Sequence, residues 1–520
     1  MSSLPQPIAV SSAGVARTPT ATVHSFPPPS PKYLVLRLSC AGVALFLGGL
    51  QAWVTRFAMA PDGISYLDMG DAYWRGDWHN AINAYWSPLY SWILGFFVNT
   101  LKPDAYHEWP LVHLVNFLIY VGSLLCFDFF LKNFVSANRT IRKAQSAYGL
   151  SEYSWWVLGY ALFTATSLLL VGLYRVCPDL CVAALVYLAS GLIVRIRCGN
   201  APSQTWILLG VVLGLSYLAK AVMFPLSFVF LTVAVAPNAS TQKRLKGWAM
   251  GLAAFLIVAA PLVLAISKQK GKITFGESGT WNYALYVDGM RYFETLQTTP
   301  SLKTPVRTIL EHPAVFEFGE PIGGTYPPWY DPTYWHDGFE TRIAIHASLY
   351  NVWRTAKVYA GVFFLLLLSS TVGACLLVIL SEGGLFRALG RSARWWPIAL
   401  PALAALAIYS PVHAEGRFLA ASAAILLLVA YAGVQARSAA GARRIDLAVW
   451  AISALAIAMV VVGPMVRWPV PGAPQRHSAL GLPTSMAQRS QMATLTLLAA
   501  GMAPPTLTTS AAPRSTTTVP

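Results

Sequence analysis

The chain alternates long apolar runs with short loops that carry basic residues. A membrane-spanning helix needs about 20 mostly apolar residues, and a soluble domain does not repeat such runs along its whole length. The sequence therefore predicts an all-α polytopic membrane protein with about eleven transmembrane helices. The predicted spans are residues 33–54, 110–131, 155–174, 180–196, 206–219, 221–236, 247–266, 357–380, 396–411, 417–434 and 446–464.

Basic residues follow every second predicted span. Lys and Arg collect in cytoplasmic loops, so these stretches and the N-terminus are predicted to be cytoplasmic, and the net charge of +16 needs no nucleic-acid partner. The apolar run 206–236 has basic residues on both flanks, so it is expected to cross twice and to turn outside, near Lys220. The basic stretches are 132–143, 195–197, 243–246, 387–394 and 437–444.

Composition divides the chain into regions. The first outer loop, 55–109, contains an apolar piece, 88–101, that is expected to lie at the interface as a helix or to form a re-entrant segment. Near the C-terminus a weak twelfth span is left open at 490–503. The expected regions are a disordered cytoplasmic tail (1–32), an N-terminal transmembrane module (33–266), a small irregular outer segment that forms a lid (267–352), C-terminal transmembrane helices (353–464) and a disordered tail (465–520).

The first outer loop combines acidic and aromatic residues. The stretch Pro61–Trp92 holds four of the 21 acidic residues of the chain, interleaved with Tyr and Trp. Carboxylates accept hydrogen bonds from sugar hydroxyls and rings stack on sugar C–H groups, so residues such as Tyr66 suit sugar recognition. A solvated loop with an interfacial aromatic belt explains the rings equally well. Asp68 and Asp71 could hold a divalent ion, although no cofactor is required.

Ionisable residues gather at the predicted outer ends of several spans. Charged groups there are costly unless they pair with one another or line a wet cavity. Pairing of Asp179 with Arg175, or of Glu415 with Arg417, is one interpretation, whereas the restriction of these groups to one side favours a shared polar cavity. The residues are Arg175, Asp179, Lys220, His413, Glu415 and Arg417.

Carboxylates and cations in one cavity suit the transfer of a sugar from a lipid phosphate. A carboxylate removes the proton of an acceptor hydroxyl, which attacks the anomeric carbon, while Lys or Arg stabilises the departing phosphate. With a monophosphate donor a metal is optional. The absence of a P-loop, a dinucleotide fingerprint and a GxSxG motif removes commoner enzyme classes. The alternatives are a transporter or flippase of a lipid-linked sugar, and a polysaccharide polymerase or ligase with a diphosphate donor.

An Asp just after the first span, followed by the aromatic PLYSW segment, resembles the GT-C membrane glycosyltransferases. The sequence is most similar to the branch that contains the protein O-mannosyltransferases and the lipid A aminoarabinose transferase. The similar blocks are Pro178–Asp179, GLSYLAKAVMFP, HAEGRF and TYPPWYDPTYWHDG, within residues 33–435. The protein O-mannosyltransferases carry a paired Asp-Glu where this chain has Asp62 and Gly63.

The resemblance implies a multi-pass protein of the bacterial inner membrane. It implies a polyprenyl-phosphate sugar donor, an inverting mechanism, and a lipid, glycan or protein acceptor on the extracytoplasmic side. It aligns Asp62 with the essential carboxylate of the first outer loop and Asp179 with the second acidic position.

The surrounding residues suggest how Asp62 and Lys220 would act. Pro61 and Gly63 are expected to place Asp62 on a stiff turn, where it serves as general base or caps the next helix. Asp179 is expected to orient the acceptor or the donor sugar. Lys220 is expected to bind the donor phosphate or to snorkel to the interface.

Overall fold

The computed structural model describes residues 33–58, 61–145, 148–199, 202–235, 240–288, 305–310, 315–318 and 345–467. The predicted tail 1–32, the weak span 490–503 and nearly all of the predicted tail 465–520 lie outside the described residues. Of the predicted tail 465–520, only residues 465–467 are described, as the end of the last helix, which continues to Arg467.

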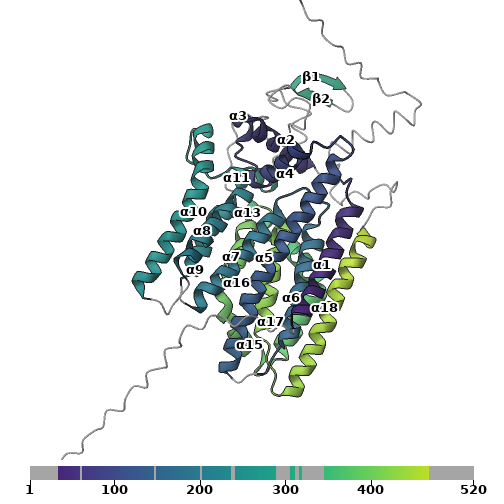
Figure 1. The fold of residues 1–520 in the computed structure, drawn as a ribbon, viewed down its shortest axis with the longest axis vertical. Coiled ribbons are helices and arrows are strands. Elements are labelled where there is room, and N and C mark those ends of the chain that lie inside the picture. The colour runs from purple at the N-terminus through teal and green to yellow at the C-terminus, as the bar shows by residue number, and fades with distance from the viewer. Residues whose placement is uncertain are drawn as a thin grey trace, which may run out of the picture.

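The described chain is helical, with a single β-hairpin among its described parts (Figure 1). Each predicted span coincides with one or more helices. The helices are α1 Leu34–Val54, α2 Pro61–Arg75, α3 Trp78–Ala81, α4 Pro88–Leu101, α5 Glu108–Ala144, α6 Glu152–Ala165, η2 Thr166–Val171, α7 Asp179–Cys198, α8 Ser203–Ala219, α9 Met223–Val233, α10 Thr241–Lys270, α11 Ser278–Tyr286, α13 Ile345–Gly361, η5 Val362–Leu366, α14 Leu368–Ile379, α15 Gly384–Ser392, η6 Ala393–Trp395, α16 Trp396–Tyr409, η7 Gly416–Leu419, α17 Ala420–Ala432 and α18 Ala439–Arg467.

The helices that coincide with the predicted spans differ in length. Six described helices are long and apolar enough to cross a membrane, namely α1, α5, α6 with η2, α7, α10 and α18, and a bent pair brings the number to seven. Other apolar helices are shorter: α9 has 11 residues, which rise about 16 Å against a hydrocarbon core of about 30 Å. The chain is a helical polytopic membrane protein that combines long spans with shorter apolar helices.

The predicted span 357–380 is not one straight helix. Residues 345–366 and 368–379 form two helical segments bent by 89°. The bend follows the π-helical turn η5, where the N–H of Leu367 bonds to the carbonyl of Val362 instead of the residue four positions back. Insertion of such a turn is a recognised cause of sharp kinks, and hydropathy alone does not detect it.

The turn predicted near Lys220 is present, whereas the two crossings and the outer location of the turn stay predictions. Helix α8 ends at Ala219 and α9 begins at Met223. Lys220, between them, pairs with Asp179 at the start of α7, whereas Arg197 near the end of α7 donates to the carbonyl of Val233 at the end of α9. Helix α9 therefore runs in the same direction as α7 and opposite to α8.

The first outer loop is folded into helices α2, α3 and α4, and two glycines bring α2 and α4 together. A Cβ on Gly70 would lie 2.6 Å from the carbonyl oxygen of Ser91, and a Cβ on Gly95 would lie 2.6 Å from the carbonyl oxygen of Gly70. The two backbones therefore touch, which is possible only without side chains at both positions. Pro88 at the start of α4 pre-sets the helical φ angle. The placement of α4 at the membrane interface stays a prediction.

The outer segment 267–352, which is expected to be irregular, contains some regular structure in its described parts. Its described parts include α11 and an antiparallel hairpin of β1 Pro305–Leu310 and β2 Val315–Phe318. In Figure 1 the hairpin, α2, α3, α4 and α11 lie at one end of the helix bundle and α15 lies at the other. Residues before α11 are bound to the rest of the chain, because the N–H of Glu277 donates to Ala84 and the hydroxyl of Tyr217 donates to Phe275.

Candidate active site

A cavity of about 480 Å³ lies where the first outer loop, α11 and several helix ends meet. Its wall combines ionisable side chains with aromatic rings. Six of the residues predicted from the sequence to form a polar cavity or to bind sugar line it, together with Asp62. The predicted residues that line it are Asp62, Tyr66, Asp179, Lys220, His413, Glu415 and Arg417.

Asp62 lies in the first turn of α2, which begins at Pro61, rather than on the predicted tight turn. Gly63 is helical, and its role is close packing, since a Cβ there would lie 2.7 Å from the side chain of Val176. The carboxylate of Asp62 is 28% exposed and lies 3.4 Å from Arg417. The position inside the first turn is not the N-cap position, so the side chain faces a distant cation instead of capping its own helix.

Arg417 joins three carboxylates of the cavity. Its NH1 and NH2 atoms lie 3.4 Å from Asp62, and its Nε atom lies 3.0 Å from Glu415 and 3.7 Å from Asp179. The predicted pairing of Glu415 with Arg417 is therefore present, while Asp62 and Asp179 share the same cation. Because its side chain is only 17% exposed, these contacts are little weakened by water.

Asp179 begins α7 and is buried, with a side chain 3% exposed. Its Oδ1 accepts a hydrogen bond of 2.7 Å from Nζ of Lys220, and its Oδ2 has no aligned hydrogen bond. The suggested pairing of Asp179 with Arg175 is wrong. Lys220 does not snorkel away either, because its ammonium is held between Asp179 and the ring of Phe418, 3.6 Å from the ring centre.

Glu415 contacts two further basic side chains, those of His413 and Arg175. Its carboxylate lies 3.3 Å from Nε2 of His413 and 3.3 Å from NH1 of Arg175. Arg175 does not line the cavity itself and contacts it through Glu415. Burial raises the pKa of Glu415, but the hydrogen bond with His413 and the charge of Arg417 outweigh it and hold the pKa well below its usual value. Glu415 is therefore an anion that fixes Arg417, not a proton carrier.

Asp62 has the opposite electrostatic character. Burial raises the pKa of Asp62 above its ordinary value, Arg417 opposes the rise, and the nearby Glu415 adds to it. A carboxylate whose pKa is raised holds a proton more tightly and is a stronger base in its ionised form. Among the carboxylates of the cavity, Asp62 therefore fits the role of proton acceptor best.

The loop before α7 is held by polar side chains of neighbouring helices, which fixes Asp179. The amide nitrogen of Asn116 donates to the carbonyls of Leu173 and Arg175, and the hydroxyl of Tyr90 donates to Asn116. His113 contacts the carbonyl of Leu173 at 2.9 Å. These residues are buried inside α4 and α5 and were not predicted to matter for the site.

An aromatic wall completes the cavity. Tyr66 is buried against Trp86, with ring centres 5.1 Å apart, and Tyr286 of α11 stacks on His413 at 3.7 Å. Sequence reasoning identified Tyr66 but missed the rings that arrive from other segments. The sequence did contain a feature that could have indicated Tyr286, because this residue lies in the aromatic segment 281–286, which follows the predicted span 247–266. The missed rings are Tyr286, Tyr409 and Phe418, whereas Tyr85 and Trp86 belong to the predicted aromatic stretch Pro61–Trp92.

Asp68 and Asp71 lie on α2 but do not line the cavity. Asp71 pairs with Arg75 at 3.3 Å and accepts a hydrogen bond from Asn99. Within the described ranges, no group of three or more His, Cys, Asp or Glu side chains could hold a metal ion. The structure thus does not bring Asp68 and Asp71 into a metal-binding group.

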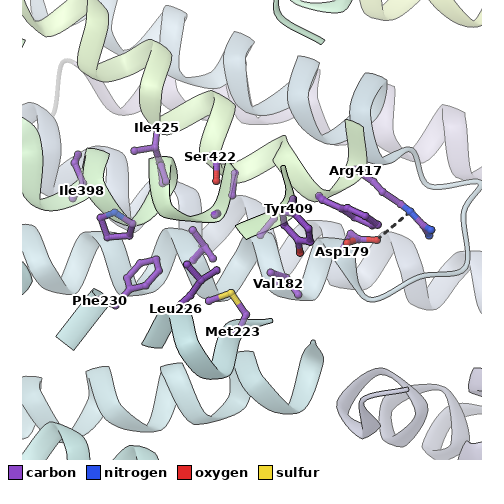
Figure 2. Close-up of a pocket in the computed structure, with 17 residues that line it drawn as sticks. Asp179, Val182, Met223, Leu226, Phe230, Ile398, Tyr409, Arg417, Ser422 and Ile425 are labelled. Carbon is purple, nitrogen blue, oxygen red and sulfur yellow. Dashed lines mark ion pairs between the residues drawn. The ribbon is translucent and has the colours of Figure 1, made fainter. Parts of the chain in front are cut away.

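A narrow apolar crevice opens beside the cavity, between α7, α9, α16 and α17. Figure 2 shows its apolar lining, which includes Met223, Leu226 and Ile425, and the ion pair of Asp179 with Arg417 at one end. The crevice has a volume of about 30 Å³, which is room for about one water molecule. The residues common to the crevice and the charged cavity are Asp179, Tyr409, Arg417 and Phe418.

Fold and site together define a multi-pass helical membrane protein with a charged, aromatic cavity at one end of its bundle and an apolar crevice leading from it. No protein-family profile matches the chain, and no curated protein matches it.

Two solved structures of ArnT from Cupriavidus metallidurans are similar to the chain. The one bound to undecaprenyl phosphate has a TM-score of 0.47 at 13% identity, over 85% of this chain and 67% of that chain. The apo state has a TM-score of 0.29 at 13% identity, over 85% and 81%. These likenesses agree with the resemblance to membrane glycosyltransferases that the sequence suggested. Because both TM-scores are below 0.5, this structural likeness says nothing about the activity of the chain.

Proposed function

We propose that the chain is a membrane glycosyltransferase that moves one sugar from a polyprenyl-phosphate donor to an acceptor hydroxyl, with inversion at the anomeric carbon. The observation that supports this most strongly is that the charged cavity and the apolar crevice share Arg417 and Asp179. A ligand that occupies both needs an anionic or polar head next to a long apolar chain. A polyprenyl-phosphate sugar, a conjugate of the kind of lipid bound in one ArnT structure, has this composition.

Each part of such a donor finds a chemical match. The sugar would lie in the cavity of about 480 Å³, against rings such as Tyr66 and Tyr286. The phosphate would lie at Arg417 and Lys220, because these cations are close to the mouth of the crevice and little exposed. The prenyl chain requires a wider crevice than the structure has, so we expect α16 to move away from α9 when the donor binds.

In the proposed reaction the bonds and charges balance without a further reagent. The Asp62 carboxylate takes the proton of the acceptor hydroxyl, the acceptor oxygen bonds to the anomeric carbon, and the bond from that carbon to the phosphate oxygen breaks. The phosphate leaves with an added negative charge that Arg417 and Lys220 stabilise. Asp179 holds Lys220 in place and accepts a hydrogen bond from the sugar through Oδ2, the oxygen that lacks an aligned partner.

The same proposal places the protein in its membrane. The predicted cytoplasmic N-terminus puts the cavity on the extracytoplasmic side of a bacterial inner membrane, where a lipid, glycan or protein acceptor is reached. Supporting this, the end of the bundle that carries α15 holds Arg387, Arg391 and Arg394, whereas the cavity end concentrates carboxylates.

The donor class is tested by the lipid that the protein retains. The protein is purified in mild detergent and its bound lipid is identified by mass spectrometry, with Arg417→Gln as the matched variant. We expect a polyprenyl monophosphate, with or without a sugar, from the parent protein and much less from the variant. Retention of a polyprenyl diphosphate would point to a polymerase or ligase, and retention of neither lipid would contradict the proposed donor.

A further inference from the structure

A second cavity, of about 390 Å³, lies between the end of α5 and the start of α6. Helix α5 connects it to the candidate active site, because Asn116 binds the loop before α7 and Arg139 lines the second cavity. The helical rise between these two residues is about 35 Å, slightly more than the hydrocarbon core of about 30 Å. The second cavity therefore lies at the opposite membrane surface.

Basic side chains dominate the lining of this cavity. Arg139, Arg142 and Lys143 line it, and Glu152 is the acidic residue in its wall. Glu152 pairs with Arg139 at 3.2 Å, which leaves Arg142 and Lys143 as the cations available to a ligand. Their arrangement on one turn of α5 suits an anion.

The nearest further carboxylate, Asp446 of α18, acts mainly on the start of α6. It accepts hydrogen bonds from the backbone N–H of Ser151 at 2.8 Å and from the hydroxyl of Ser154 at 2.6 Å. The Asp446 carboxylate also interacts electrostatically with the Arg142 guanidinium. Asp446 therefore holds the start of α6 and does not line the cavity.

Two buried donors in the wall lack an acceptor. The Nε1–H of Trp155 and the Nε–H of Arg142 find no hydrogen-bond partner among the described residues, and Trp155 is 2% exposed. A buried donor without a partner is unfavourable, so such groups normally meet an acceptor from protein, water or ligand. Oxygen atoms of an anion in the cavity would supply these acceptors.

The wall around Arg142 is fixed rather than loose. Its NH1 atom donates to the carbonyl of Leu150, and a Cβ on Gly149 would lie 3.3 Å from the guanidinium carbon and 3.0 Å from the carbonyl oxygen of Val434. A side chain at 149 would crowd both groups, so glycine favours this close approach of the guanidinium to the backbone. The cavity is thus shaped before a ligand arrives.

We propose that this cavity binds the phosphate group of an anionic phospholipid. A lipid is favoured over a soluble phosphate because the site lies at the membrane surface and combines cations with Trp155, Tyr148 and apolar Val135. Helix α15 marks the same surface, since Trp395 beyond it lies 4.2 Å from Phe134, whose ring in turn contacts Trp155. On α15, Phe386 is 85% exposed next to the exposed Arg387, as in helices that lie on anionic membranes.

The test uses the full chain in neutral detergent, titrated with phosphatidylglycerol, phosphatidylcholine or inorganic phosphate and followed by native mass spectrometry. We expect one phosphatidylglycerol to bind more tightly than phosphatidylcholine. Arg142→Gln should weaken that binding about tenfold or more, the loss typical of one hydrogen bond to a charged group. The matched control is Arg394→Gln, an exposed Arg of the same end that does not line the cavity.

Two further variants keep the test decisive if Arg142→Gln unfolds. Lys143→Gln removes an exposed cation, and Trp155→Phe removes one N–H while keeping a ring against Phe134; both should weaken phosphatidylglycerol binding and leave phosphatidylcholine unchanged. Equal binding in the parent and in both variants overturns the proposal. Displacement of the lipid by inorganic phosphate at a similar concentration overturns the lipid assignment and leaves an anion site.

Discussion

Arg417 is the residue on which the charges of the candidate site depend. One guanidinium lies within 3.4 Å of Asp62, 3.0 Å of Glu415 and 3.7 Å of Asp179, and Lys220 neutralises the other oxygen of Asp179. Buried charges tolerate such crowding only while each keeps an opposite partner. Substitutions here therefore act on stability and on activity together, and paired substitutions are needed to separate the two.

Lys220 offers that separation. Lys220→Met leaves the buried carboxylate of Asp179 without its closest cation, so the folded state should lose on the order of 3–5 kcal/mol. Adding Asp179→Asn removes the unpaired charge and should restore most of the thermal stability in detergent. If Lys220 holds the donor phosphate, the double variant should still bind polyprenyl phosphate weakly. A double variant that regains both stability and lipid affinity would leave Lys220 a purely structural role.

The raised pKa of Asp62 predicts the acidic limb of the pH profile. A general base acts in its ionised form, so kcat/KM should fall as the pH drops through the pKa of Asp62. Because burial raises that pKa, the fall should begin above the range of an ordinary Asp, about 3.9. The residual transfer by Asp62→Asn should lack this limb. A limb that persists unchanged in that variant would assign it to another group.

At the scale of elements, the site depends on how closely α2 approaches α4. Gly70 and Gly95 bring the two backbones into contact, and Asp62 lies on the same helix as Gly70. Gly95→Val should push α2 outward, at a cost of about 1–3 kcal/mol, and should lower transfer more than donor binding because the base is displaced. Gly122→Val on α5, where a Cβ meets nothing within 4 Å, is the matched control. Similar losses in both variants would argue against a positioning role for the crossing.

The elements were predicted more reliably than their contacts. Apolar runs predicted the helices, because burial in lipid needs only composition and length. The 89° bend at Leu367 was missed, since a π-helical turn leaves no mark on hydropathy. Likewise Asp62, Asp179 and Arg417 were identified as unusual charges at span ends, but their mutual pairing depends on which helices pack together. The stacking of Tyr286 on His413 depends on the position of α11, which composition does not specify.

At the scale of the whole molecule, the two ends of the bundle have different chemistry. The candidate active site is lined from α2, α11 and the start of α7, whereas the basic cavity is lined from the end of α5 and the start of α6. Figure 1 shows α2 and α11 at one end of the bundle and α15 at the other. The basic end is predicted to face the cytoplasm. This orientation determines on which side of the membrane the acceptor is modified.

Labelling with a membrane-impermeant thiol reagent checks the orientation. In a variant with the exposed Cys198 and Cys375 replaced by Ser, Lys272→Cys should react in intact cells and Gln145→Cys only after the cells are opened. Both positions are exposed in the structure, so lack of reaction reports the membrane and not burial. Reaction of Gln145→Cys in intact cells would place the candidate active site on the cytoplasmic side.

The proton-accepting role of Asp62 is tested most directly by comparing two Asp→Asn variants of α2 in a reconstituted transfer assay with a polyprenyl-phosphate sugar. Asp62→Asn keeps the size of the side chain and a partner for Arg417 but cannot accept a proton, so turnover should fall by roughly 10²–10⁴-fold with donor binding retained. Asp71→Asn, on the same helix but outside the cavity, should transfer sugar at nearly the parent rate. Near-normal turnover by Asp62→Asn would contradict the proposed mechanism.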